Sequence, residues 1–233
     1  MPIKDDTWFK TRTYLHFDPP TSKKTAFSII SSPSKVSSHS YYPLIRFTIS
    51  TQKIRFNKAE SKVERKPPKD REISYAAHLD SHIYSYYCQI LDELYEQTLK
   101  ESDLDDVVLA FRKKGKSNIN FAHDAFNEIS LRKNCCAIGL DITGFFNNLD
   151  HQILKNSWRD LLNLKALPAD HYSIYKSLTK FSFVNRDDLY NALKIPSTNP
   201  KNGRTRVCTP EEFRVLVRGN GLITINHESP QLS

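Results

Sequence analysis

Glycine and cysteine are scarce in this sequence, and long apolar runs are absent. The 233 residues include 6 glycines, and none of them belongs to a GxxxxGK[ST] or GxGxxG turn, which excludes the P-loop and Rossmann types of nucleotide site. The 4 cysteines show neither the CxxC spacing of a zinc site nor the pattern of a secreted disulfide framework. We therefore expect reduced thiols in or near the core, at Cys88, Cys135, Cys136 and Cys208.

No run of about 18 apolar residues occurs, and the residues after Met1 lack the apolar segment of a signal peptide. These absences predict a cytoplasmic protein without a membrane partner. Internal repeats and coiled-coil heptads are absent as well. A chain of 233 residues with 39% hydrophobic content can bury one substantial core, so we expect one incomplete domain with an N-terminal extension.

Positive charge is concentrated at the N-terminal end. The chain has 34 Lys and Arg against 26 Asp and Glu, a formal net charge of +8. Residues 1–75 hold 15 of the basic and 7 of the acidic side chains, whereas the remainder holds 19 of each. A solvated basic face explains this asymmetry, and so does a surface that follows the phosphates of a nucleic acid.

Apolar spacing predicts the order of helices and strands. Residues 1–45, rich in Ser, Pro and Tyr, are expected to form an irregular, partly ordered arm. A charged loop without helix is expected from Lys62 to Arg71, because prolines interrupt it. His78 and His82 lie one turn apart on the longest helix, but without an HExxH glutamate we expect them to be exposed or hydrogen-bonded rather than metal ligands. The expected strands are Leu44–Ser50, Lys53–Phe56, Val107–Phe111 and a buried Cys135–Leu140, and the expected helices are Tyr75–Lys100, Ser117–Leu131 with Ser117 as N-cap, 149–164, 169–181, 186–193 and 210–218.

The segment Ala137–His151 carries the main chemical signal. An apolar run ends at Asp141 and leads directly into a turn with two adjacent phenylalanines, Phe145 and Phe146. A carboxylate at a strand end is a rigid mount for a divalent ion, and the carbonyl of Ile142 is a hard oxygen ligand for a second one. Taken without its surroundings, Asp141 is equally a helix cap or a surface aspartate after a buried strand.

The order of these residues, D-I-x-x-F-F-x-x-L-x-H, resembles the first catalytic motif of bacterial retroelement reverse transcriptases of the retron and group II intron type. It is closest in appearance to the defence-associated or abortive-infection members. The resemblance implies two-metal nucleotidyl transfer with Mg²⁺ or Mn²⁺ bound at Asp141 and Ile142. It also implies that Phe146 is the steric gate that selects deoxynucleotides, whereas Phe145 is expected to be a core aromatic.

Two upstream segments resemble the same family in the expected order. Lys66–Ile73 is similar to the fingers stretch K-x-x-x-R-x-I, which implies that Lys69 and Arg71 reach the triphosphate of a nucleotide. Ala110–Ser117 is similar to the F-R-x-G-x-S turn that lies along template or primer. The competing interpretation of both segments is a solvated basic turn. The residues assigned to nucleic acid by this resemblance are Lys66, Arg112, Lys113 and Lys116.

The family pattern would continue with a GxPQG turn and a YxDD hairpin, whereas this sequence ends in Asn226–Ser233, where Pro230 and Gln231 stand without the flanking glycines. We expect a truncated or altered terminus and no polymerase activity from this chain alone. The fold is predicted to be α/β and helix-rich, the fingers and partial palm of a right-hand polymerase with an incomplete palm sheet. The predicted regions are a basic extension (1–60), fingers (61–134), partial palm (135–226) and a divergent end (227–233).

The resulting hypothesis is a fragment of an RNA-directed DNA polymerase with a possible antiphage role. Its partners would be an RNA template, a DNA primer and a deoxynucleoside triphosphate, and further a noncoding RNA or a separate C-terminal polymerase piece. The alternative is a non-catalytic RNA- or DNA-binding module derived from a reverse transcriptase. A third reading, a purely structural interaction protein, requires that no nucleic acid bind at low salt.

Overall fold

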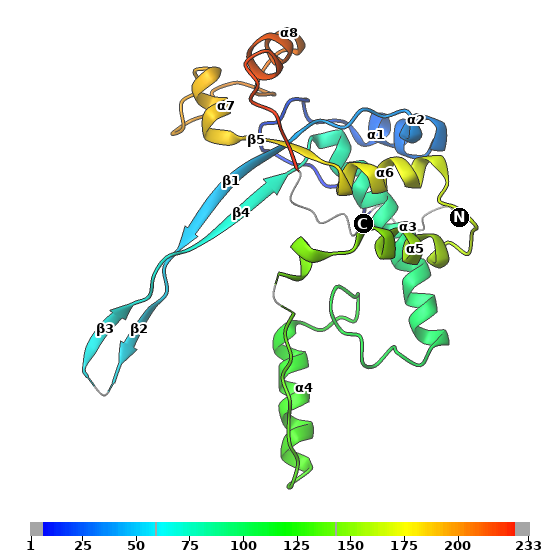
Figure 1. Ribbon diagram of the computed structural model, residues 1–233, viewed down its shortest axis with the longest axis vertical. Helices are drawn as coiled ribbons and strands as arrows, with labels where there is room; N and C mark the ends of the chain where they lie inside the picture. Colours follow the sequence, from blue (N-terminus) through cyan, green and yellow to red (C-terminus); the bar gives the residue numbers. More distant parts are fainter. Residues whose placement is uncertain (1–6, 59, 143, 227–233) are drawn as a thin grey trace. The chain divides into compact units, whose positions relative to one another are not determined.

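The computed structural model describes residues 7–58, 60–142 and 144–226 and shows a mixed α/β chain (Figure 1). The chain divides into two compact units. Unit 1 comprises residues 1–89 and 166–229, and unit 2 comprises residues 90–165 with 230–233. Among the described helices, none combines the length and apolar character needed to cross a membrane.

Unit 1 is built on a mixed four-stranded sheet with the strand order β4-β1-β5-β6. The predicted strand Leu44–Ser50 is confirmed as β1, in which apolar and polar residues alternate as a half-buried strand requires. It pairs antiparallel with β4 and parallel with β5, and β5 pairs antiparallel with β6. The strands are β1 (Leu44–Thr51), β4 (Lys69–Tyr75), β5 (Ser182–Asn185) and β6 (Thr224–Ile225).

A two-stranded ribbon, β2 (Ile54–Asn57) with β3 (Lys62–Arg65), extends the β1–β4 pair (Figure 1). The predicted strand Lys53–Phe56 is confirmed, but the expected charged loop from Lys62 to Arg71 is wrong, because β3 and the start of β4 occupy most of it. The two prolines at 67 and 68 fall between β3 and β4, where the missing N–H of proline costs no ladder hydrogen bond.

The main hydrophobic core of unit 1 combines sheet residues with α7 (Arg186–Ala192), the π-helical η2 (Phe213–Arg218) and irregular segments. The short α8 (Pro210–Glu212) leads into η2 and buries none of its own residues. The predicted helices 186–193 and 210–218 are thus confirmed, the second with a change of helix type. The core residues are Leu15, Phe17, Ile45, Val184, Leu189, Ile195, Val207, Cys208, Phe213 and Val217.

The N-terminal segment is an integral part of unit 1. The expectation of irregular structure is confirmed for residues 7–22, but the expectation of a partly ordered arm is wrong, because the segment packs into the unit. It forms α1 (Lys23–Ile30), capped by Ser22, and α2 (Pro33–Ser37), which packs on α6 (Ala169–Thr179). Trp8 and residues 15–17 are buried. Their aromatic and aliphatic surface is stabilising only when it is removed from water, which requires an ordered chain around it.

The predicted long helix is confirmed as α3 (His78–Glu101), and the division between the units falls within it. Its first backbone N–H groups are capped from a distance, because Asp18 accepts hydrogen bonds from the N–H of His78 at 2.8 Å and of Leu79 at 2.9 Å. His78 and His82 are buried rather than exposed. No metal ligand group of three or more His, Cys, Asp or Glu residues occurs in the described chain.

Unit 2 contains the rest of α3, α4 (Asn118–Leu131), the short 3-10 helix η1 (Phe145–Asn148) and α5 (His151–Leu161). The Ser117 cap is confirmed, because its side chain accepts from the N–H of Asn120. Helices near 117–131 and 149–164 are therefore confirmed. The expected core position of the cysteines holds for Cys208, which is buried, and is wrong for Cys88, Cys135 and Cys136, which are exposed.

Two predicted strands of unit 2 are wrong. Residues 107–111 form turns, and Phe111 takes a left-handed φ of 60°. The segment Cys135–Leu140 is neither paired nor buried, and Leu140 is 92% exposed. The apolar run has the composition of a buried strand, but a strand needs a hydrogen-bonding neighbour and an apolar layer, and the described part of unit 2 supplies neither.

Candidate nucleic-acid interface

Strand β4 separates positive from negative charge onto its two faces. Successive side chains of a strand point to opposite faces, so Lys69, Arg71 and Ile73 share one face while Asp70 and Glu72 share the other. The antiparallel register places Thr51 opposite Lys69, Ile49 opposite Arg71 and Phe47 opposite Ile73. The face with the two cations, named here the basic face of β4, therefore carries no carboxylate from either strand.

Hydrogen bonds hold both faces in place. On the basic face, Nη1 of Arg71 donates to Oγ1 of Thr51 at 3.0 Å, which orients the guanidinium and leaves its other donors available. On the opposite face, Arg46 pairs with Glu72 at 3.2 Å and lies 3.5 Å over the ring of Phe183. The positive charge of Arg46 is thus neutralised within the protein, whereas Lys69 and Arg71 are exposed to water.

The basic face of β4 ends at a cavity of about 600 Å³ in unit 1. The cavity wall is mostly aromatic and aliphatic, with Phe47 and Ile73 from facing positions of β1 and β4. A volume of this size with few polar groups is typical of a small-molecule or nucleotide site. The remaining wall consists of Tyr14, Leu15, Tyr75, Arg186, Tyr190 and residues 198–201.

Two cations border this cavity. The guanidinium of Arg186 lies 4.6 Å over the ring of Phe47 and forms an ion pair with Asp187 at 3.1 Å. Lys201 is exposed and has no carboxylate within ion-pair distance in the described chain. Burial raises the pKa of Tyr14, Tyr75 and Tyr190 above the ordinary value, so their hydroxyls are neutral at pH 7 and the cavity carries a net positive charge.

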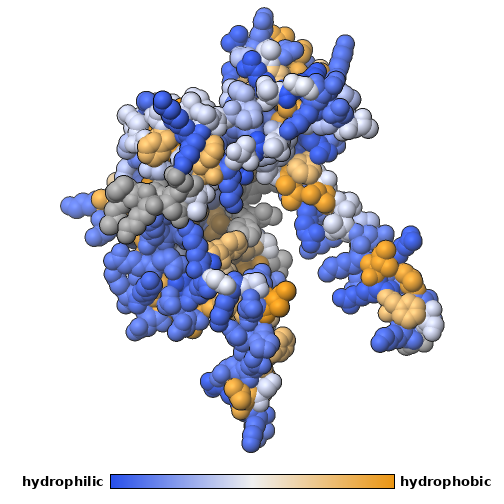
Figure 2. Space-filling view, turned by 180° about the vertical axis from the view of Figure 1, so that it is seen from behind, coloured by the Kyte–Doolittle hydropathy of each residue, from blue (hydrophilic) through white to orange (hydrophobic). Residues whose placement is uncertain are grey.

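The β2–β3 ribbon adds an exposed basic and apolar surface. Its register places Ile54 opposite Arg65 and Phe56 opposite Val63, so these four side chains share one face. All of them are exposed, and Figure 2 shows apolar side chains among charged ones on this arm. Residues 52–71 contain eight Lys or Arg and three Asp or Glu. Lys66 belongs to this run, is exposed, and donates its backbone N–H to Lys53 O at 3.0 Å.

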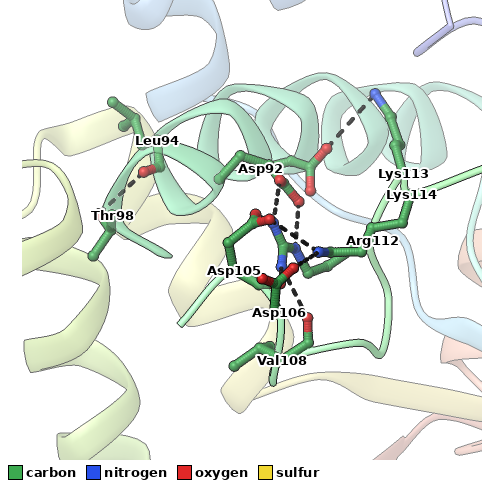
Figure 3. Close-up of polar contacts among 10 residues, drawn as sticks. Asp92, Leu94, Thr98, Asp105, Asp106, Val108, Arg112, Lys113 and Lys114 are labelled. Atoms are coloured by element: carbon green, nitrogen blue, oxygen red, sulfur yellow. Dashed lines mark hydrogen bonds and ion pairs between the residues drawn. The ribbon is translucent and has the colours of Figure 1, made fainter. Parts of the chain in front are cut away.

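Arg112 has a structural role in unit 2. Its side chain is 1% exposed and lies among acidic and carbonyl oxygens (Figure 3). Nε and Nη2 donate to Glu96, Nη2 donates to the Asp105 carboxylate, and Nη1 donates to the carbonyls of Asp105 and Val108. These five bonds use all five N–H groups of a guanidinium. The expected phosphate contact of Arg112 is therefore corrected to stabilisation of the 105–112 loop.

The neighbouring lysines remain on the surface. Lys113 is 65% exposed and lies 3.6 Å from Asp92, and Lys116 lies 2.8 Å from Asp124. Exposed pairs of this kind contribute little to stability and exchange readily for a phosphate. Lys113 and Lys116 lie near a solvent-facing turn of unit 2, whereas Lys69 and Arg71, expected in a charged loop, lie in strand β4 of unit 1.

Asp141 and Ile142 lie in an exposed stretch without regular structure. The described residues hold no group of three or more potential metal-binding His, Cys, Asp or Glu side chains. One carboxylate and one carbonyl do not fit a pair of divalent ions, which needs carboxylates from more than one element. The side chain of Phe146 lies outside the described residues, as do Pro230 and Gln231, whereas Phe145 is half exposed rather than a core residue.

Sequence patterns did not indicate the cavity. Tyr14, Arg186, Tyr190 and Lys201 come from segments far apart in the chain, and only the pairing of β1 with β4 and the position of α7 bring them together. The one local signal is the R-T-Y-L-H-F segment at residues 12–17, which concentrates aromatic side chains in a stretch otherwise read as irregular.

Comparison with protein-family models finds no match for this chain, and a search of curated protein sequences finds none either.

Proposed function

We propose that this chain is a nucleic-acid-binding protein of the reverse-transcriptase type, which holds RNA through the basic face of β4 and the adjoining β2–β3 ribbon. One observation carries the proposal. Lys69 and Arg71 share a face of β4 that is free of carboxylates in the β1–β4 pair, while Asp70 and Glu72 point away. A surface with this segregation attracts phosphates without internal neutralisation.

The resemblance of three sequence segments to bacterial reverse transcriptases supports the same proposal. In that family the position of Lys69 and Arg71 is associated with nucleotide phosphates, and a planar guanidinium beside a mobile ammonium suits such a ligand. The proposed partners are an RNA template, a DNA primer and a deoxynucleoside triphosphate. The right-hand polymerase fold, the fingers and palm regions and an antiphage role belong to this proposal.

No catalytic step is assigned, because the residues present do not fit a two-ion centre. In the proposal Asp141 supplies one carboxylate for Mg²⁺ or Mn²⁺, and the other carboxylates come from outside these 233 residues, for example from a separate C-terminal polymerase piece. Primer extension by this chain alone is not expected. Template-dependent extension that disappears in Asp141→Ala would establish a polymerase and contradict a function limited to binding.

The binding test compares two double variants that remove the same charge. Lys69→Gln with Arg71→Gln is expected to weaken binding to a labelled single-stranded RNA by about tenfold or more. The slope of log Kd against log salt concentration should fall by about 1.4, because two phosphate contacts to a single strand are lost. The measurement is fluorescence anisotropy over a salt series.

The matched control is Lys10→Gln with Lys24→Gln, two exposed lysines of unit 1 outside the β1–β4 pair and its ribbon. This control should leave both the affinity and the slope close to those of the unchanged protein. An equal loss in the two double variants would mean that net charge alone attracts RNA, and would contradict the proposed surface. Absence of RNA binding at low salt would favour a structural interaction protein instead.

A further inference from the structure

The aromatic cavity beside the basic face of β4 is not explained by phosphate contacts. Its wall includes Phe47, Ile73 and Tyr75 at the end of the β1–β4 pair, and Tyr190 from α7. A binding surface that only follows a phosphate backbone needs cations but no apolar cavity. The cavity therefore requires a ligand part that is planar or apolar as well as one that is anionic.

The arrangement of charge around the cavity matches a nucleotide. Arg186 stands over Phe47 and Lys201 borders the cavity from the 198–201 loop, so cations lie beside an aromatic wall. Arg71 lies two positions before Ile73 on β4, so its side chain is on the same face as this cavity-lining residue. A strand of phosphates on the basic face would thus pass directly by the cavity.

We propose that this cavity holds one unpaired nucleotide of a bound RNA strand, with the base against the aromatic wall and the adjoining phosphates at Lys201 and Arg71. The inference rests on the proposed RNA-binding function and names which part of the RNA is recognised. A base within a continuous duplex cannot enter a cavity, because it is stacked and paired. An unpaired base is free to leave the strand and stack on tyrosine or phenylalanine.

Hydrogen-bonding groups are available to hold the base edge. The hydroxyl of Thr198 and the side-chain N–H groups of Asn199 line the cavity and can donate to any of the four bases. The Tyr190 hydroxyl interacts with that of Tyr75, and Oδ1 of Asn199 accepts from the N–H of Asn202 at 3.3 Å. This predicts a preference for unpaired over paired nucleotides with weak dependence on which base is present.

The test compares two labelled RNA duplexes of the same length and sequence, one fully paired and one with a single bulged nucleotide. The bulged duplex is expected to bind about tenfold more tightly at the same salt concentration, because one base is stacked on aromatic side chains. Ile73→Trp fills the cavity from β4 and should bring the bulged duplex to the affinity of the paired one.

Leu178→Trp is the matched control, because Leu178 is an exposed apolar residue of unit 1 on α6 that neither lines the cavity nor lies on the basic face of β4. It should keep the preference for the bulge. Urea unfolding midpoints of both variants establish that they fold. Lys201→Glu provides a second test that leaves the apolar wall intact and should reduce the preference, whereas Lys194→Glu, an exposed lysine outside the cavity wall, should not.

The outcomes separate this inference from the function on which it rests. If both duplexes bind equally well and Ile73→Trp changes neither, the cavity does not hold a base, although RNA binding itself stands. If neither duplex nor single-stranded RNA binds, the proposed function fails as well. Displacement of the bulged duplex by adenosine monophosphate at comparable concentration would assign the cavity to a free nucleotide and overturn the proposal.

Discussion

Burial of histidine is the most distinctive feature at the scale of single residues. His16 is 0% exposed, and its Nε2 lies 3.3 Å from the carbonyl oxygen of Tyr75, to which it donates when it carries the proton. Burial lowers the pKa of His16 to about 3 and that of His82 to about 4, and it lowers the pKa of His78 as well. These rings are held neutral at the centre of unit 1.

The buried histidines predict acid sensitivity. Above about pH 6.5 they are neutral in both the folded and the unfolded chain, so they add no pH dependence there. Between pH 6.5 and about 3 the unfolded chain binds protons that the folded chain excludes, so the free energy of unfolding should fall as the pH falls. Urea unfolding measured at steps from pH 7 to pH 4 tests this expectation.

His16→Gln keeps a side-chain donor and removes the titrating group. It should flatten the pH dependence below pH 6.5 relative to the unchanged protein, even if stability at pH 7 decreases. Asp80 acts in the opposite direction, because burial raises its pKa while His39 and the N–H of Tyr42 stabilise the carboxylate. An unchanged slope in His16→Gln would show that other groups cause the acid sensitivity.

At the scale of elements, α3 depends on residues distant in sequence. Its periodic apolar positions predict the helix, but its N-terminal cap, Asp18, precedes the helix by 60 residues. Helix N-termini carry unsatisfied N–H groups, and a carboxylate that accepts two of them is stabilising. These two hydrogen bonds join the N-terminal segment to the start of α3.

Asp18→Ala should lower the free energy of unfolding by about 1 kcal/mol, the usual contribution of a helix cap. Asp18→Asn retains one oxygen acceptor and should lose less. The measurement is the midpoint and slope of urea unfolding at pH 7, with circular dichroism as the signal. Equal unfolding midpoints for Asp18→Ala and the unchanged protein would show that the cap contributes nothing to stability.

Helices and strands could be predicted from the sequence where the interactions that form them are local. Helices α3 to α7 and strand β1 were predictable, because their apolar periodicity lies within the element itself, even though the N-terminal cap of α3 comes from the distant Asp18. Two expectations were wrong in opposite ways. A strand was expected at Cys135–Leu140, which is irregular, and a charged loop was expected at Lys62–Arg71, which is mostly strand. In both, the outcome depended on whether a partner strand was present, which local sequence does not state.

At the scale of the whole molecule, unit 2 exposes a large amount of apolar surface. The extended stretch 134–142 and helix α4, which buries none of its residues, present their apolar side chains to solvent. Monomeric proteins seldom leave large contiguous apolar patches uncovered. The exposed residues include Ile119, Phe126, Leu131, Ile138, Leu140 and Ile142.

This surface predicts self-association and binding of hydrophobic dyes. Simultaneous replacement of Ile138, Leu140 and Ile142 by serine should reduce both, with little change in the unfolding midpoint, because these side chains are not packed in a core. Light scattering and dye fluorescence are the measurements. Serine at Asn118, Lys133 and Asn134, exposed polar residues of the same unit, should change neither, and an equal effect would contradict a role for the apolar stretch.

The sequence by itself determined the class of fold, mixed α/β, most helices, the first strand of the sheet and the positions of the basic residues 66–71. These follow from local periodicity, capping and charge order, which involve neighbours a few residues apart. Tertiary structure decided that Lys69 and Arg71 face away from Asp70 and Glu72, that all N–H groups of Arg112 are used in internal hydrogen bonds, and that distant aromatic residues line one open cavity. Each of these depends on strand register and long-range packing, where one partner is fixed by another far along the chain.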